Sequence, residues 1–141
     1  MRIGIIAAME KEIKKKMPYV NVINKACPLL AQMAEEGWIK NKVAKHTIKE
    51  YLKVFKYSNI QKLVLGCTHY PLFTDLIKKE LGKKVEIINT GENVANYLKK
   101  HIEKTTTQKP NYEFYLTDLE SEFIKVAYNI LGKEIEVKLA T

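Results

Sequence analysis

Residues 62–71, KLVLGCTHYP, carry the clearest secondary-structure signal in this chain. Only Lys62 is charged among the first five residues, and a short apolar run of this kind is typical of a strand buried in a parallel sheet. The residues after Pro71 have helical composition as far as Leu81, and Gly82 stands where such a helix would end. The segment therefore predicts a strand, a loop and a helix in that order.

The same alternation of strand and helix extends outward in both directions. Pro28 suits the first turn of a helix, and Thr117 with Glu120 matches a capping box that would open another. The expected strands are residues 2–7, 20–23, 62–66, 85–88, 112–116 and 134–138; the expected helices are residues 8–16, 28–36, 42–57, 72–81, 92–104 and 118–131, with a turn at 89–91. Because each parallel crossover needs a helix-length connection, this order predicts a three-layer α/β/α fold with a mostly parallel sheet.

The helix expected over residues 42–57 is amphipathic. Its apolar positions follow a period close to 3.6 residues, with lysines on the other side: Val43, Ile48, Tyr51, Leu52 and Phe55. We expect these residues to face the sheet and the lysines to face solvent.

The length of 141 residues corresponds to one domain, and we expect a single α/β domain over residues 1–141. Residues 105–110 are both polar and unpatterned, which favours a hinge or linker there. The strand-helix-strand unit that follows, residues 112–138, either pairs into the same sheet or reaches toward another chain. The pattern alone leaves both arrangements open.

The chain is basic but lacks the composition of a nucleic-acid reader. Lys plus Arg total 24 against 16 Asp plus Glu, a formal net charge of +8, and Arg2 is the only arginine. The guanidinium fork is the commonest reader of base edges, and the lysines are spread along expected helix surfaces. We therefore expect no nucleic-acid partner. We also expect no membrane insertion, because no uncharged apolar run approaches the roughly 20 residues of a span.

The two cysteines, Cys27 and Cys67, are too few for a disulfide-built scaffold and lack the paired spacing of a zinc site. A reducing cytoplasm fits this composition, and no metal is expected. The apolar run at residues 3–9 is interpreted as a buried strand entering a helix, because charged residues follow it at once.

Cys67, Thr68 and His69 occupy the kind of loop where ligands of parallel α/β sheets gather, outside the carboxyl end of a strand. The backbone N–H groups that open the following helix favour a thiolate at Cys67 and suit a substrate carboxylate at Thr68. His69 can exchange protons near neutral pH. A cysteine after an apolar strand is otherwise most often a small core residue, so its position alone permits both interpretations.

A resemblance favours the functional interpretation. Residues 65–72, LGCTHYPL, resemble the second cysteine motif of the glutamate racemases, and residues 26–30, ACPLL, followed by residues 35–37, EEG, are similar to that family's upstream element. Their order and separation agree as well. The resemblance implies one half of the aspartate/glutamate racemase fold and cofactor-independent interconversion of L- and D-glutamate. It also implies a cytoplasmic role in peptidoglycan synthesis, and thus in cell wall biogenesis and cell shape.

The resemblance also implies roles for particular residues. Cys67 corresponds to one catalytic acid/base and Thr68 to a contact with the substrate glutamate. His69 corresponds to the assistant in proton transfer, with Glu36 as its polar partner. Cys27 does not correspond to a catalytic residue and is expected to be packed inside. No cofactor is implied.

The chain also departs from that family. Its members are about twice as long and begin with a domain that carries an Asp-Ser-Gly-rich loop and the first catalytic cysteine, in a Cys-Asn-Thr setting. Neither pattern occurs in this sequence. Since inversion needs a proton donor and acceptor on both faces of the α-carbon, we expect the chain to be weak or inactive alone. The alternative is a non-catalytic module that binds an amino acid or a partner chain, and an uncovered sheet surface is compatible with homo-oligomerisation.

A second resemblance concerns the first twelve residues. Residues 1–12, MRIGIIAAMEKE, are similar to the start of the methylthioadenosine/S-adenosylhomocysteine nucleosidases, in which the last acid, here Glu12, contributes to the site. None of that family's later glycine-rich, ribose-binding or purine-binding elements follows. The same residues also fit the racemase strand that precedes the Ala-Cys-Pro-Leu segment.

Overall fold

The computed structural model describes residues 1–6, 10–102, 112–118 and 121–140. The linker expected at residues 105–110 and Glu120 of the expected capping box lie outside these ranges. In chain order the elements are β1 (Arg2–Ile6), α1 (Glu10–Lys16), β2 (Asn21–Asn24), α2 (Pro28–Glu35), α3 (Lys42–Lys56), β3 (Lys62–Leu65), the 3₁₀ turn η1 (Tyr70–Phe73), α4 (Thr74–Leu81), β4 (Glu86–Asn89), α5 (Thr90–His101), β5 (Phe114–Leu116), α6 (Ser121–Leu131) and β6 (Val137–Leu139). The predicted alternation of strands and helices is confirmed.

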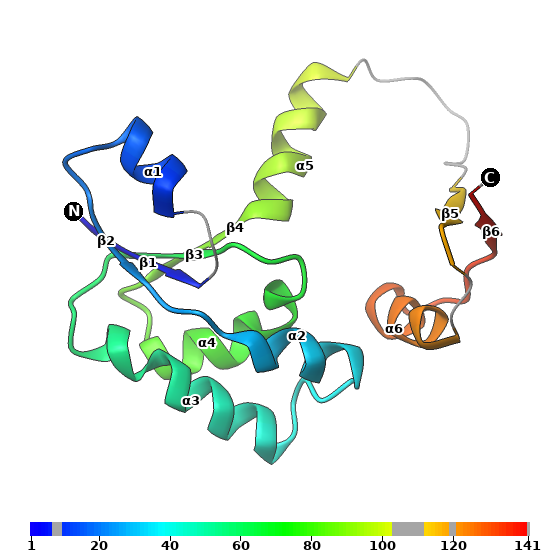
Figure 1. Ribbon diagram of the computed structural model, residues 1–141, viewed down its shortest axis with the longest axis horizontal. Coiled ribbons are helices and arrows are strands. Elements are labelled where there is room, and N and C mark those ends of the chain that lie inside the picture. The colour runs from blue at the N-terminus through cyan, green and yellow to red at the C-terminus, as the bar shows by residue number, and fades with distance from the viewer. Residues whose placement is uncertain (7–9, 103–111, 119–120, 141) are drawn as a thin grey trace.

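The main sheet has four parallel strands in the order β2-β1-β3-β4 (Figure 1). Ile6 of β1 lies opposite Leu65 of β3, and Leu65 lies opposite Asn89 of β4, so three strands end at the same edge. The predicted α/β class with a parallel sheet flanked by helices is therefore confirmed. β1, formed by the segment that also resembles a nucleosidase start, is an inner strand of this sheet.

Helices cover both faces of the main sheet, as buried parallel strands require. Leu63 and Leu65 of β3 belong to the larger core, together with residues of α2, α3 and α4. Val64, which points to the opposite face of the same strand, belongs to a smaller core beside Ile13 of α1 and nearby Met17. Most of the buried apolar surface thus lies between the sheet and the layer of α2, α3 and α4.

One prediction for α3 is wrong in detail. Val43 is 49% exposed, whereas its neighbour Ala44 is fully buried in the larger core. Ala44 lies on the same stripe of the helix as Ile48 and Leu52, four and eight residues further on. Val43 is rotated by about 100° from that stripe, since each residue of an α-helix turns by this angle. The apolar type of Val43 therefore did not indicate its burial.

The starts of one helix and one strand also differ from the sequence-based expectation. The expected turn at residues 89–91 is the beginning of α5, where the Asn89 side chain accepts hydrogen bonds from the N–H groups of Gly91 and Glu92. Asparagine favours turns and helix N-caps for the same reason, because its side chain bonds to nearby backbone N–H groups. At the other end of the chain, β6 begins at Val137 rather than at Glu134.

The C-terminal strands do not join the main sheet. β5 and β6 pair in parallel with each other and form a separate two-stranded sheet, in which Phe114 lies opposite Val137. The helix between them, α6, lies beside α2, while α5 projects away from the main sheet (Figure 1). Among the described residues, no helix is long and apolar enough to span a membrane.

Candidate active site

Cys67 lies just beyond the carboxyl end of β3, as predicted. Gly66 donates its N–H to the Ile6 carbonyl of the neighbouring strand β1 at 3.1 Å, which continues the sheet one residue past β3. The N–H of Tyr70 donates to the Cys67 carbonyl at 3.2 Å and turns the chain back. The Cys67 side chain is partly buried against the larger core. The loop therefore holds a thiol at the sheet edge where ligands of parallel α/β folds bind.

His69 connects this thiol to a carboxylate. Its Nδ1 lies 3.7 Å from Cys67 Sγ, and its Nε2 lies 3.3 Å from Oε1 of Glu35 at the end of α2. When Nε2 carries the hydrogen and donates it to Glu35, Nδ1 is left with a lone pair that can accept the thiol proton. The three side chains thus form a path for moving a proton to and from Cys67.

The predicted partner of His69 was Glu36, but the carboxylate beside the imidazole is Glu35. Glu36 is the C-cap residue of α2 and lines a cavity of about 270 Å³ together with Trp38. Adjacent helical residues point in directions about 100° apart, so only one of the two can reach His69. The sequence motif contains both Glu35 and Glu36. The rotation of α2 about its axis places Glu35 beside His69 and turns Glu36 away from it.

The helix after the cysteine loop starts later than the sequence suggested. The backbone first makes the 3₁₀ turn η1, and α4 begins only at Thr74. Pro71 lies inside this turn, which no side chain caps. The favourable field of an α-helix weakens beyond its first turn, and Cys67 precedes α4 by seven residues. His69 is therefore the nearest group able to activate the thiol.

Cys27 lies in a different environment. It is 1% exposed, its thiol lies 3.7 Å from the Lys25 carbonyl, and burial raises its pKa to about 12. Tyr70 reaches over it and donates its hydroxyl to the Cys27 carbonyl at 3.0 Å. Burial and the Cys27 thiol also raise the pKa of Tyr70 to about 12. The placement agrees with the expectation of a packed cysteine.

Two threonines lie at the same sheet edge. Thr68 is exposed, and no hydrogen bond within the described ranges occupies its hydroxyl, which leaves it available to a ligand. Thr90, at the start of α5, donates its hydroxyl to the Leu65 carbonyl at 3.1 Å and so ties the end of β4 to the end of β3. No sequence motif indicated Thr90 as a site residue. The rule that neighbouring parallel strands end at one edge could have indicated it.

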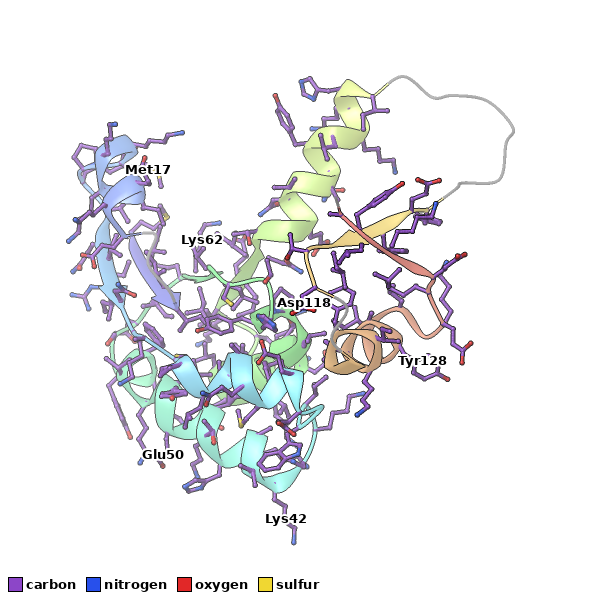
Figure 2. The ribbon with its side chains drawn as sticks, turned by 45° about the vertical axis from the view of Figure 1, so that its right-hand side comes forward. Met17, Lys42, Glu50, Lys62, Asp118 and Tyr128 are labelled. Atoms are coloured by element: carbon purple, nitrogen blue, oxygen red, sulfur yellow. The ribbon has the colours of Figure 1, made fainter. Side chains whose placement is uncertain are left out.

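Two cavities of the described structure lie away from the cysteine loop. No group of three or more His, Cys, Asp or Glu residues among the described parts of the chain is placed to hold a metal ion. A cavity of about 360 Å³ lies between α3 and α4, and its lining includes Lys42, Lys49, Lys79 and the apolar side chain of Leu76. Figure 2 shows Lys42 pointing outward at the start of α3. Cys67 lines neither this cavity nor the one beside Glu36.

Comparison with known proteins gives one consistent result. No family model matches the chain. Among curated proteins, glutamate racemases from Geobacter metallireducens and Neisseria meningitidis are 33% and 35% identical to it, over 95% and 96% of its length. The alignments cover 54% of each relative. The chain therefore spans about half the length of the curated relatives it matches.

Solved structures agree with the sequence matches. A glutamate racemase from Francisella tularensis, in complex with D-glutamate, superposes with a TM-score of 0.82 at 32% identity. Glutamate racemase isoform RacE1 from Bacillus anthracis superposes with a TM-score of 0.81 at 30% identity. Each match covers 99% of this chain and 57% of the other. Because so little of this chain is left out, the matches include the N-terminal strand as well as the cysteine loop.

Proposed function

This chain is a homologue of the glutamate racemases that spans about half of their length, and we propose that it supplies one of the two acid/base faces of such an enzyme. The observation that carries the proposal is the contact of Cys67 with His69, whose other ring nitrogen meets Glu35. A thiol, an imidazole and a carboxylate at the carboxyl end of a parallel strand form a site for reversible proton transfer at carbon.

In the proposed reaction the acid/base group is the Cys67 sulfur. His69 Nδ1 accepts the thiol proton, and the resulting thiolate removes the α-proton of glutamate, which leaves the electron pair on the α-carbon and converts the thiolate back to a thiol. A proton donor on the opposite face then completes the inversion. Glu35 acts as a positioning residue, because it holds the Nε2–H and stabilises the imidazolium that forms. Nothing in this sequence of steps requires a cofactor.

Glutamate is the proposed substrate. Support comes from the relatives' names and from D-glutamate in the Francisella tularensis structure. The exposed hydroxyl of Thr68, next to the reacting thiol, is the proposed contact to the substrate. A role in peptidoglycan precursor supply and a cytoplasmic location follow if the chain shares the activity of its relatives, and both belong to the proposal.

We further propose that the reaction is incomplete in this chain alone. The other cysteine, Cys27, is buried, and its thiol is hydrogen-bonded to a backbone carbonyl. It therefore does not supply a thiol on the opposite face of the substrate. A single base can remove an α-proton and return one from solvent on the same side. Inversion requires an acid on the other side, and acid/base groups of this kind typically contribute factors of about 10² to 10⁴ to a rate.

The test uses purified chain with L-glutamate and, separately, D-glutamate in D₂O. Proton NMR follows exchange at the α-carbon, and chiral chromatography follows inversion. We expect α-proton exchange in one enantiomer, loss of that exchange in Cys67→Ser, and inversion at least about 100-fold slower than in a full-length racemase. Cys27→Ala is the control, because its thiol lies away from the site. Inversion at the full racemase rate would contradict incompleteness, and exchange that persists in Cys67→Ser would remove Cys67 from the mechanism.

The second candidate is a non-catalytic module of the same fold that binds an amino acid or a partner chain. The large exposed apolar surface of the C-terminal elements favours it. A module of this kind would bind glutamate or a protein without needing a reactive thiol. The rate at which Cys67 is alkylated separates the two candidates, because only the acid/base function needs a reactive thiol.

A further inference from the structure

Helix α5 exposes an apolar side that no other described element covers. Val94, Tyr97 and Leu98 lie at positions i, i+3 and i+4, which share one side of a helix, and each is at least 45% exposed. No residue of α5 is buried. A helix with such an apolar stripe normally buries it against a core. The exposed stripe of α5 therefore suits contact with a further polypeptide.

The β5–α6–β6 unit is similarly uncovered. Parallel sheets occur almost always as part of larger sheets with both faces covered, and two strands alone are marginally stable. Here the two strands have no further neighbour among the described residues, and Tyr115 and Leu139 are 55% and 50% exposed. Both outer edges of this small sheet therefore have backbone groups free to pair with an added strand.

Helix α6 extends the same surface. Ile124, Tyr128 and Leu131 form one apolar stripe, while Phe123 and Ile130 form a second beside it, and all five are exposed by 39% or more. A helix that is apolar around more than half of its circumference is normally buried on more than one side. α2 provides one neighbour, and Figure 2 shows Tyr128 at the outer side of α6. The remaining apolar side has no cover among the described elements.

The C-terminal elements that carry this surface differ from the rest of the chain in net charge. Residues 1–89 contain 17 Lys and Arg against 8 Asp and Glu, whereas residues 90–141 contain 7 against 8. The net charge of +8 therefore belongs to the main sheet and its helices. The C-terminal elements are close to neutral and rich in exposed tyrosine, phenylalanine and aliphatic residues, which is the composition of a protein-protein interface core rather than of an anion-binding surface.

We infer that α5 and the β5–α6–β6 unit form a docking surface for the polypeptide that corresponds to the part of the glutamate racemases this chain does not span. The inference rests on the proposed function. That part makes up 46% of the Geobacter metallireducens relative, since the alignment covers 54% of it. The occupant adds at least one strand to the β5–β6 sheet and covers the apolar sides of α5 and α6.

A second copy of this chain fits the surface less well. Twofold symmetry places the same strand of each copy edge to edge in antiparallel orientation, whereas both strands of the small sheet are parallel. A homodimer is therefore one of the outcomes that the test below distinguishes.

The experiment co-expresses the full chain with the uncovered segment of the Geobacter metallireducens racemase as a separate polypeptide, and repeats this with the Neisseria meningitidis segment. Light scattering after size exclusion gives the composition of the complex, and titration of purified components gives its affinity. Ile124→Lys on α6 tests the surface, and Val54→Lys on α3 is the matched control, since the two side chains are 43% and 42% exposed. Circular dichroism checks that both variants fold.

We expect a one-to-one complex that Ile124→Lys weakens at least about tenfold and Val54→Lys leaves unchanged, as for an apolar side chain inside an interface and one outside it. Recovery of the chain without either segment overturns the inference, as does equal affinity of both variants. A dimer of the chain alone that Ile124→Lys dissociates also overturns it in favour of a second copy. A complex that binds normally but does not racemise glutamate supports the docking surface and contradicts the proposed function. Cys67→Ser should bind as the parent chain does.

Discussion

At the scale of single residues, the two cysteines show how burial and neighbouring groups determine the reactivity of a thiol. Cys67 is partly buried, lies at the sheet edge and contacts an imidazole. Cys27 has the same side chain but is enclosed by the core, where burial raises its pKa to about 12. A neutral thiol is a poor nucleophile and a poor base near neutral pH, so Cys27 is inert while it is buried.

Alkylation by iodoacetamide near neutral pH measures this difference. We expect one thiol to react in the native chain, at Cys67, and none in Cys67→Ser until the protein is denatured. Glu35→Gln should slow the reaction severalfold, because the imidazolium that stabilises the thiolate loses its charged partner.

Glu36→Gln is the matched control, because its carboxylate is adjacent in sequence but lies beside Trp38 rather than His69. Mass spectrometry of peptides assigns the modified cysteine. Equal effects of the two glutamate variants would show that Glu35 has no specific role, and an unreactive Cys67 would favour the non-catalytic module.

At the scale of elements, β1 is the strand on which the sheet depends, since it pairs with both β2 and β3. Gly4 in this strand lies directly beneath the side chains of Phe55 and Ile60. A Cβ added at Gly4 would stand 2.8 Å from Ile60 and 2.9 Å from the Phe55 ring, closer than packed carbon atoms approach. The absence of a side chain at this position allows α3 to pack onto the sheet.

Gly4→Ala should therefore destabilise the chain by about 1–3 kcal/mol, because Phe55 is fully buried and has little room to move. Urea denaturation followed by circular dichroism measures the free energy of unfolding. Gly91→Ala is the control: its added Cβ would lie at an ordinary distance of 3.5 Å from the Asn89 side chain, near the start of α5. Comparable losses in both variants would show that the contact beneath α3 is not the cause.

At the scale of the whole molecule, the chain has a well-packed part and an uncovered part. Among the residues whose burial the structure describes, nearly all the buried apolar ones belong to the four-stranded sheet and its helices α1 to α4 or the loops between them, and Ala127 is the single one in the C-terminal unit. Stability within a protein follows the distribution of buried contacts, so the two parts should open with different free energies.

Amide hydrogen exchange tests this division. In the chain alone, amides of β1 and β3 should be the most protected, and those of α5, β5, α6 and β6 should exchange on the order of 100-fold faster or more. Binding of the co-expressed segment described above should slow exchange in the C-terminal elements and leave β1 and β3 nearly unchanged. Equal protection throughout the free chain would contradict an uncovered C-terminal surface.

Local patterns in the sequence were enough to predict the order of strands and helices, the parallel α/β class and the position of Cys67 after β3. These features are local because the hydrophobic period, the turn residues and the strand ends depend on residues that are neighbours in the sequence. Three features depended on packing between distant segments instead. The rotation of α2 placed Glu35 rather than Glu36 at His69, the stripe of α3 buried Ala44 rather than Val43, and β5 paired with β6 outside the main sheet. Periodicity indicates which residues are apolar, but the partner that covers them is determined only when the elements pack together.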